Sequence, residues 1–128
     1  MFATITTSQM VLASVFLLMG TLHFVRPKPF DAIMPKFIPR EYRRPLTLIS
    51  GFFELLGGVG VLLPFSRAWA GVGLLLLLIA VFPANVQMLL TARETKAPAA
   101  AQAALWIRLP MQGLLAWWVW QATLTATA

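Results

Sequence analysis

The residues AWAGVGLLLLLIAVFPANVQMLLT, numbered 68–91, decide the class of fold. This run contains no Asp, Glu, Lys or Arg, and a single proline interrupts it. It is longer than the roughly 20 residues that cross a hydrocarbon core about 30 Å thick. Because unpaired backbone groups are not stable in lipid, such a run predicts a transmembrane helix rather than an isolated strand.

The composition of the whole chain agrees with this prediction. Of its 128 residues, 59% are hydrophobic and 11% are charged, whereas soluble domains average about 45–50% and about 25%. These values exclude an ordinary soluble globular domain. The apolar stretches predict four spans, at residues 8–25, 46–65, 68–91 and 104–124. We therefore expect one all-α domain over residues 1–128, a four-helix transmembrane bundle with an interfacial, Pro-rich amphipathic loop between helices 1 and 2.

The loop at residues 26–45 contains five prolines, which oppose a long regular helix. Its apolar residues nevertheless recur at helical spacing, interleaved with basic ones, a pattern typical of broken turns in the headgroup region. We expect four basic side chains of this loop to face anionic lipid or a partner: Lys36, Arg40, Arg43 and Arg44. Two interpretations stay open, a membrane-anchored linker and a lid over a site between the helices.

The basic residues predict the orientation in the membrane. The two loops expected on one side carry eight lysines and arginines, whereas the other side carries only Arg67. The positive-inside rule places the basic loops in the cytoplasm and both termini outside, in the periplasm of a multi-pass protein of the bacterial cytoplasmic (inner) membrane. We therefore attribute the net charge of +6 to orientation in the membrane rather than to nucleic-acid binding, and we expect no nucleic acid among the partners.

The sequence also limits the chemistry of the chain. It has no cysteine and one histidine, His23. Disulfides, thiolate nucleophiles and cysteine-ligated clusters are therefore excluded within one chain, and no metal site is expected. A redox role would need an organic cofactor or a partner subunit.

Each predicted span contributes one strong polar side chain to the cytoplasmic half of the bundle: His23, Glu54, Asn85 and Arg108. Charged residues inside a span need a partner or a water-filled cavity, so we expect Glu54 to face Arg108 with Asn85 beside them. Gln112 lies one turn beyond Arg108. These five residues are candidates for binding a ligand or handling protons; the alternative is a structural clamp. Gly57 and Gly58 fall on the face of Glu54 and predict close helix packing.

Several motifs together resemble the DoxX family of small bacterial integral membrane proteins. They are Gly20-Thr21-Leu22-His23-Phe24-Val25-Arg26-Pro27, the segment 33–39, Ser50-Gly51-Phe52-Phe53-Glu54, the segment 81–88 and Arg108-Leu109-Pro110-Met111-Gln112. The resemblance runs from about Gly20 to Trp120. It implies a compact four-helix transmembrane bundle and an association with membrane redox complexes.

The function expected on these grounds is redox-associated, with a quinone-like or other small lipophilic ligand in the cytoplasmic half of the bundle. The possible partners are the lipid membrane, a redox subunit and a second copy of the chain. Two alternatives stay open, a non-enzymatic membrane assembly or binding protein and a small transporter. The sequence identifies no catalytic residue and leaves open whether the chain is an enzyme.

Overall fold

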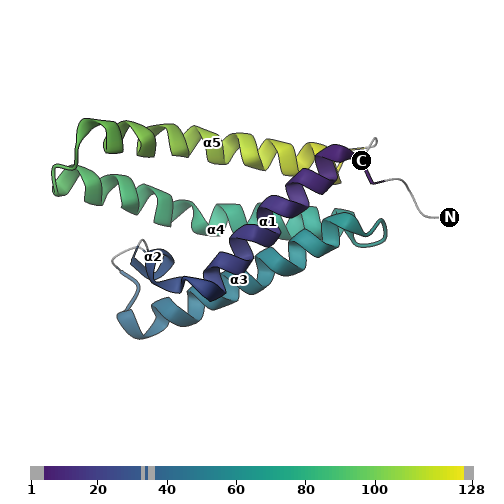
Figure 1. Cartoon of the computed structure of the whole chain (residues 1–128), viewed down its shortest axis with the longest axis horizontal. Coiled ribbons are helices and arrows are strands. Elements are labelled where there is room, and N and C mark those ends of the chain that lie inside the picture. The colour runs from purple at the N-terminus through teal and green to yellow at the C-terminus, as the bar shows by residue number, and fades with distance from the viewer. Residues whose placement is uncertain (1–4, 33, 35–36, 126–128) are drawn as a thin grey trace.

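The computed structural model of the chain describes residues 5–32, 34 and 37–125, and its regular elements are all helices (Figure 1). The helices are α1 (Thr7–Val25), α2 (Pro27–Ala32), α3 (Arg40–Leu62), α4 (Arg67–Glu94) and α5 (Ala99–Thr123). Each long helix coincides with most of one predicted span, although α3 ends at Leu62 rather than at residue 65, and the short α2 lies within the predicted Pro-rich loop.

Three of the described helices, α1, α3 and α4, are long and apolar enough to cross a membrane. Helix α5 is 25 residues long but is not among these three, and Arg108 and Gln112 interrupt its apolar run. The membrane character expected from composition is therefore supported by three helices. A fourth span along α5 stays a prediction.

The long helices form two antiparallel pairs. Helix α1 packs along α3 and α4 packs along α5, while α3 also contacts α4 and so joins the two pairs. The start of α1 and the end of α5 lie at one end of the molecule, which we call the terminal end (Figure 1). Helix α2 and the α4–α5 connection lie at the other end, which we call the α2 end. The pairs diverge from the terminal end toward the α2 end.

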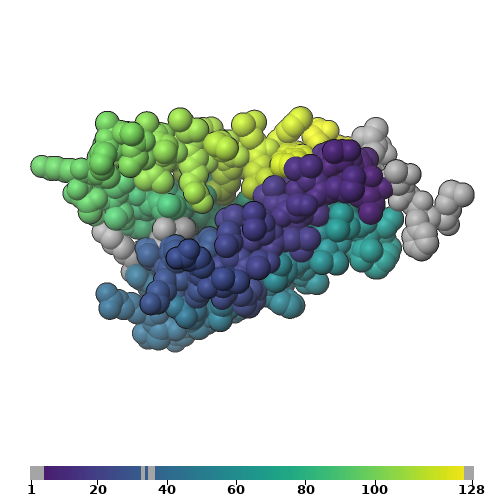
Figure 2. Space-filling view, in the orientation of Figure 1, coloured from purple at the N-terminus to yellow at the C-terminus, as the bar shows by residue number. Residues whose placement is uncertain are grey.

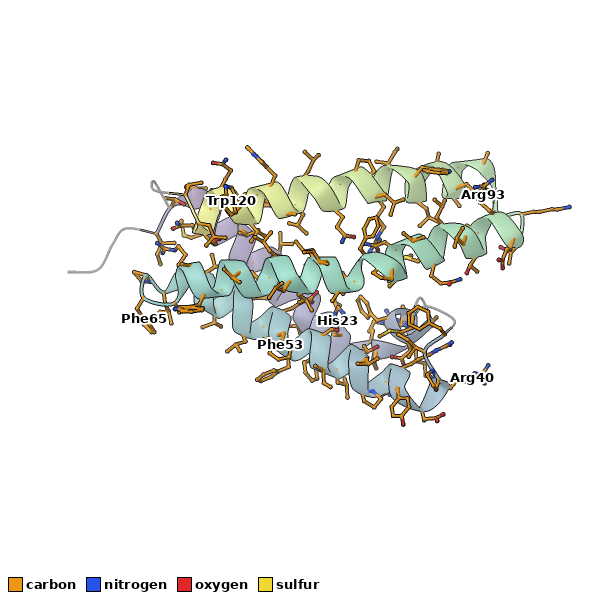
Figure 3. The ribbon with its side chains drawn as sticks, turned by 180° about the vertical axis from the view of Figure 1, so that it is seen from behind. His23, Arg40, Phe53, Phe65, Arg93 and Trp120 are labelled. Carbon is orange, nitrogen blue, oxygen red and sulfur yellow. The ribbon has the colours of Figure 1, made fainter. Side chains whose placement is uncertain are left out.

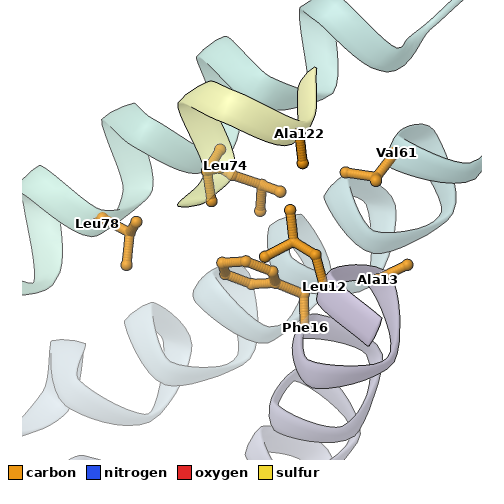
Figure 4. Close-up of a cluster of buried hydrophobic side chains, with 8 residues drawn as sticks. Leu12, Ala13, Phe16, Val61, Leu74, Leu78 and Ala122 are labelled. Atoms are coloured by element: carbon orange, nitrogen blue, oxygen red, sulfur yellow. The ribbon is translucent and has the colours of Figure 1, made fainter. Parts of the chain in front are cut away.

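The hydrophobic core lies where the pairs meet, toward the terminal end (Figure 4). All four long helices contribute to it, through Leu12, Ala13, Phe16, Val61, Leu74, Leu78, Val119 and Ala122. Lipid tails are as apolar as these side chains, so close packing rather than escape from water stabilises such a contact. The core therefore holds the pairs together at one end and leaves their other ends joined by fewer contacts.

Polar contacts also stabilise the terminal end. Helix α1 begins with a capping box, in which Thr6 Oγ1 accepts from the Gln9 amide at 3.1 Å and Gln9 Oε1 accepts from the Thr6 amide at 3.0 Å. The side chain of Gln9 also donates through Nε2 to the Ala122 backbone carbonyl of α5, at 3.0 Å. Arg67, at the start of α4, is buried and donates through Nε to the Val61 carbonyl of α3 at 2.8 Å.

The outer surface is strongly apolar. Large hydrophobic side chains are exposed on every long helix, including Leu18, Phe53, Ile79 and Trp120. Phe53 and Trp120 point away from the neighbouring helices (Figure 3). The space-filling view shows α1 lying against α3, with the start of α1 in contact with the end of α5 (Figure 2). A surface of this kind suits lipid rather than water.

The structure corrects one boundary of the predicted loop. Helix α3 begins at Arg40 rather than at residue 46, so Arg40, Arg43 and Arg44 lie on its first turns and not in an irregular loop. Pro45 lies inside the helix, close to its start, where the exposed surroundings let water satisfy the carbonyl that loses its partner. Lys36, the fourth basic residue of the predicted loop, lies outside the described residues.

Candidate functional site

The first polar cluster joins α1 to α3. His23 lies near the end of α1, and its Nδ1 is 3.3 Å from Glu54 Oε2 on α3. Both side chains are largely buried, with 9% of His23 and 13% of Glu54 exposed. The only histidine of the sequence and an acidic residue predicted inside a span therefore lie beside each other between two helices.

The histidine does not satisfy this carboxyl group with a well-formed hydrogen bond. His23 Nδ1 lies closer to the Met19 carbonyl, at 2.7 Å, and a carbonyl oxygen only accepts, so Nδ1 carries a hydrogen that it donates there. Glu54 Oε2 is buried and has no hydrogen-bond partner among the described residues. A buried oxygen in this state is costly and has the capacity to accept a hydrogen bond from a ligand or a water molecule.

Helix α2 covers the histidine. The ring of Phe30 stacks on the imidazole of His23, with centroids 3.8 Å apart and an interplanar angle of 19°. Asp31, the next residue, attaches α2 to α3: its carboxylate accepts from Thr47 Oγ1 at 2.6 Å and from Arg44 Nε at 2.9 Å. Helix α2 thus places the aromatic ring of Phe30 on His23, the residue that lies beside Glu54.

The second polar cluster joins α4 to α5. Asn85 donates through Nδ2 to Gln112 Oε1 and accepts at Oδ1 from Arg108 Nε at 3.2 Å. Gln112 in turn donates through Nε2 to the Leu78 carbonyl at 2.6 Å. Asn85 lies nine residues before the end of α4 and Arg108 nine residues after the start of α5. The antiparallel pairing therefore brings them to the same height.

The expected pairing of Glu54 with Arg108 was wrong. Glu54 lies against His23, and Arg108 bonds to Asn85. Depth estimates place residues at a height along the bundle, but the rotation of each helix and its choice of neighbour decide which side chains meet. The five candidate residues therefore form two clusters, one on each helix pair.

A recess lies between α2 and the α4–α5 pair, at the α2 end. Its volume is about 240 Å³, and it is lined by Ala32 of α2, by Leu105 of α5 and by four residues of α4: Gln87, Met88, Thr91 and Ala92. The lining is mainly apolar. Gln87 Nε2 donates to Thr91 Oγ1 at 3.0 Å, which places a polar group at one wall of the recess.

The glycines of α3 lie at close helix contacts. A Cβ on Gly57 would overlap Leu74 of α4, and one on Gly58 would lie 2.9 Å from Leu17 Cγ of α1. The two residues face different neighbours, as expected for a helix between two others. Gly51, one turn before Glu54, is as close: an added Cβ would lie 2.6 Å from His23 Cβ.

The sequence interpretation did not assign roles to three side chains of this region. Asp31, Thr47 and Phe30 were not among its candidate site residues. Asp31 is one of only two acidic residues, with Glu41, in the segment 26–45, which holds six lysines and arginines, and this contrast was the signal available. Nothing in the spacing identified Thr47 as its partner on a separate helix.

The described residues contain no group of three or more His, Cys, Asp or Glu side chains able to hold a metal ion. The two clusters can form hydrogen bonds and exchange protons. One places a histidine beside a carboxyl group, and the other joins amide and guanidinium groups on the second helix pair. Such groups bind and orient a polar headgroup.

Three long apolar helices and an apolar outer surface, together with polar clusters between paired helices, indicate a helical membrane protein. The chain belongs to a family described as a domain of unknown function (DUF8561), which matches residues 12–123. No curated protein matches the chain, and no solved structure matches it.

Proposed function

We propose that this protein binds a small lipophilic molecule with a polar headgroup, of the quinone type, with the headgroup at the α1–α3 interface beside Glu54 and the tail toward the α4–α5 pair. The observation that carries the proposal is Glu54 Oε2, a buried carboxyl oxygen without a hydrogen-bond partner in the described structure. An oxygen of this kind inside a membrane span is by default a functional candidate. A quinol hydroxyl is a donor that fits it.

The residues present fit such a ligand in both of its parts. Glu54 and His23 offer an acceptor and an imidazole to the headgroup, and the recess beside Met88 and Leu105 offers an apolar surface to a tail. A bound quinone supplies two-electron, two-proton redox chemistry, which the side chains of this cysteine-free chain do not. Glu54 would accept a hydrogen bond from the headgroup, and His23 would exchange protons at its second ring nitrogen.

The same proposal includes the finer membrane arrangement. Four spans, with α5 as the fourth, would form one bundle in the bacterial inner membrane, with the α2 end in the cytoplasm and the terminal end outside. Arg40 and Arg93 lie at the α2 end (Figure 3), where the positive-inside rule requires basic residues. The resemblance to the DoxX family supports a redox association, in which a partner subunit would supply or remove electrons.

Binding of a short-chain quinone to the purified full chain tests the proposal. The reduced form, decylubiquinol, carries the hydroxyl donor and is expected to bind saturably under anaerobic conditions and to raise the melting temperature in detergent. Glu54→Gln should weaken this binding by about two- to tenfold, because the hydrogen bond it disrupts is worth roughly 0.5–1.5 kcal/mol. Glu41→Gln is the matched control, since it makes the same change at an exposed position of the same helix. Equal affinity in all three proteins, or no saturable binding, would refute the proposal.

A further inference from the structure

The α2 end carries a second recess, separate from the polar clusters. Its volume is about 620 Å³, and its walls come from α2 and the first turns of α3: Lys28, Asp31, Ala32, Arg40, Arg43 and Arg44. Four cationic side chains thus surround one carboxylate. A volume of this size is typical of small-ligand sites.

The single carboxylate is already engaged. Asp31 accepts hydrogen bonds from Arg44 Nε and Thr47 Oγ1, at 2.9 Å and 2.6 Å, and these contacts hold α2 against α3. The positive charge of the remaining cations is therefore not neutralised by Asp31. Within the part of the chain that the structure describes, the exposed side chains of Lys28 and Arg40 have no hydrogen-bond or ion-pair partner.

The surroundings of the recess indicate a membrane interface. Phe37 and Tyr42, close in sequence to Arg40 and Arg43 of the lining, have 80% and 57% of their surfaces exposed, and the exposed apolar side chains of Leu46 and Ile49 follow on α3. Helix α3 thus changes from cationic to apolar within two turns. Aromatic side chains at such a boundary are typical of the headgroup level of a bilayer.

We propose that this recess is a binding site for the phosphate of an anionic phospholipid. Lys28 and Arg40 contact the phosphate oxygens, Arg43 adds a third cation, and the acyl chains lie along the apolar surface that follows on α3. Arginine and lysine are the side chains that phosphate binds best. Free phosphate shares the same chemistry, but the adjoining apolar surface favours the lipid.

Native mass spectrometry of the full chain in detergent tests this inference. Phosphatidylglycerol and phosphatidylcholine with the same acyl chains are titrated separately, and inorganic phosphate forms a third titration. The wild type is expected to bind phosphatidylglycerol more tightly than phosphatidylcholine. The double variant Lys28→Gln with Arg40→Gln should lose about fivefold in affinity for each cation removed.

The charge-matched control is the double variant Arg93→Gln with Lys96→Gln. It removes two cations from exposed positions at the same end of the molecule and should leave phosphatidylglycerol binding unchanged. Lys28→Gln alone, at an exposed side chain of the short α2, should lose part of the phosphatidylglycerol affinity. This single variant keeps the inference testable if the double variant does not fold. Melting temperatures in lipid-free detergent should agree among all of these proteins.

Each other outcome overturns the assignment. If phosphatidylglycerol and phosphatidylcholine bind equally, or if the control variant loses as much affinity as the test variant, the recess is not a specific site. If inorganic phosphate alone binds saturably, competes with the lipid and depends on Lys28 and Arg40, the ligand is a soluble phosphate rather than a lipid. Quinone binding serves as a separate readout, because the inference does not depend on it.

Discussion

His23 of α1 and Glu54 of α3 lie against each other across the helix interface, with Nδ1 3.3 Å from Oε2, yet the histidine donates its hydrogen bond to the Met19 carbonyl. The carboxyl oxygen is left without a donor among the described residues. The α1–α3 interface therefore brings together a buried imidazole and a buried carboxyl group, but only the imidazole has a well-formed hydrogen bond. This relationship connects the packing of the helices to the proposed ligand site.

The close approach that creates this contact depends on Gly51. We expect Gly51→Ala to destabilise the protein by about 1–3 kcal/mol, because the new methyl group would overlap His23 Cβ, which has little freedom to move. Gly73→Ala is the matched control: no atom lies within 4 Å of its added Cβ, and the better helix propensity of alanine should stabilise by up to about 1 kcal/mol. Unfolding in mixed detergent micelles measures both, and equal effects would contradict the packing described for α1 and α3.

The hydrogen bonds of Gln112 join α5 to α4 through Asn85 and the Leu78 carbonyl. Gln112→Leu is expected to lower the free energy of unfolding by about 0.6–1.7 kcal/mol, the range found for hydrogen bonds between membrane helices. Gln121→Leu makes the same change at an exposed position of α5 and should have little effect. A Gln112 variant as stable as the wild type would show that this cluster does not hold the pair together.

Asp31 attaches α2 to α3 and so keeps Phe30 on His23. Asp31→Ala should weaken this attachment by about 1–2 kcal/mol, mainly through the loss of the buried Thr47 contact, because the half-exposed Arg44 contributes little. Amide hydrogen exchange in α2 is expected to become about tenfold faster. Glu41→Ala, at an exposed acidic residue of α3, should leave that exchange unchanged. Unaltered exchange in the Asp31 variant would mean that other contacts hold α2.

The absence of cysteine makes the orientation in the membrane directly measurable. Cysteines are introduced singly at Ala68 near the terminal end and at Thr95 near the α2 end, both exposed positions. A membrane-impermeant maleimide should label Ala68→Cys in intact cells and Thr95→Cys only after the inner membrane is permeabilised. The reverse pattern would place the basic loops outside and contradict the proposed topology.

The sequence predicted the long helices well, because length and hydropathy suffice to recognise a span. It misplaced the start of α3 because the dense charges and proline at residues 40–45 suggested a loop. A helix that leaves the bilayer continues into the headgroup region, where water and lipid phosphates satisfy its polar groups. Periodicity and hydropathy contain no signal that separates this case from an irregular turn.

The sequence did not predict the pairings of the polar candidates, and their role as a site stays a prediction. The five residues are divided between two clusters, in which the partner of Glu54 is His23 and that of Arg108 is Asn85. Sequence spacing fixes which residues share a face of one helix. Which face meets which neighbour depends on the packing of Gly51 and Gly58 against α1 and of Gly57 against α4, and this three-dimensional arrangement is not readable from one sequence.

Photolabelling with a short-chain azidoquinone tests the central claim most directly, because it reports where the ligand lies. The full chain in detergent is illuminated with the reduced probe under anaerobic conditions, digested and mapped by mass spectrometry, with unlabelled decylubiquinol as competitor. The account predicts competable labelling on the segments of α1 and α3 around His23 and Glu54 and on α4 near Met88, and loss of this labelling in Glu54→Gln. Labelling spread over lipid-facing residues such as Leu18, Leu76 and Leu114, without competition, would contradict it.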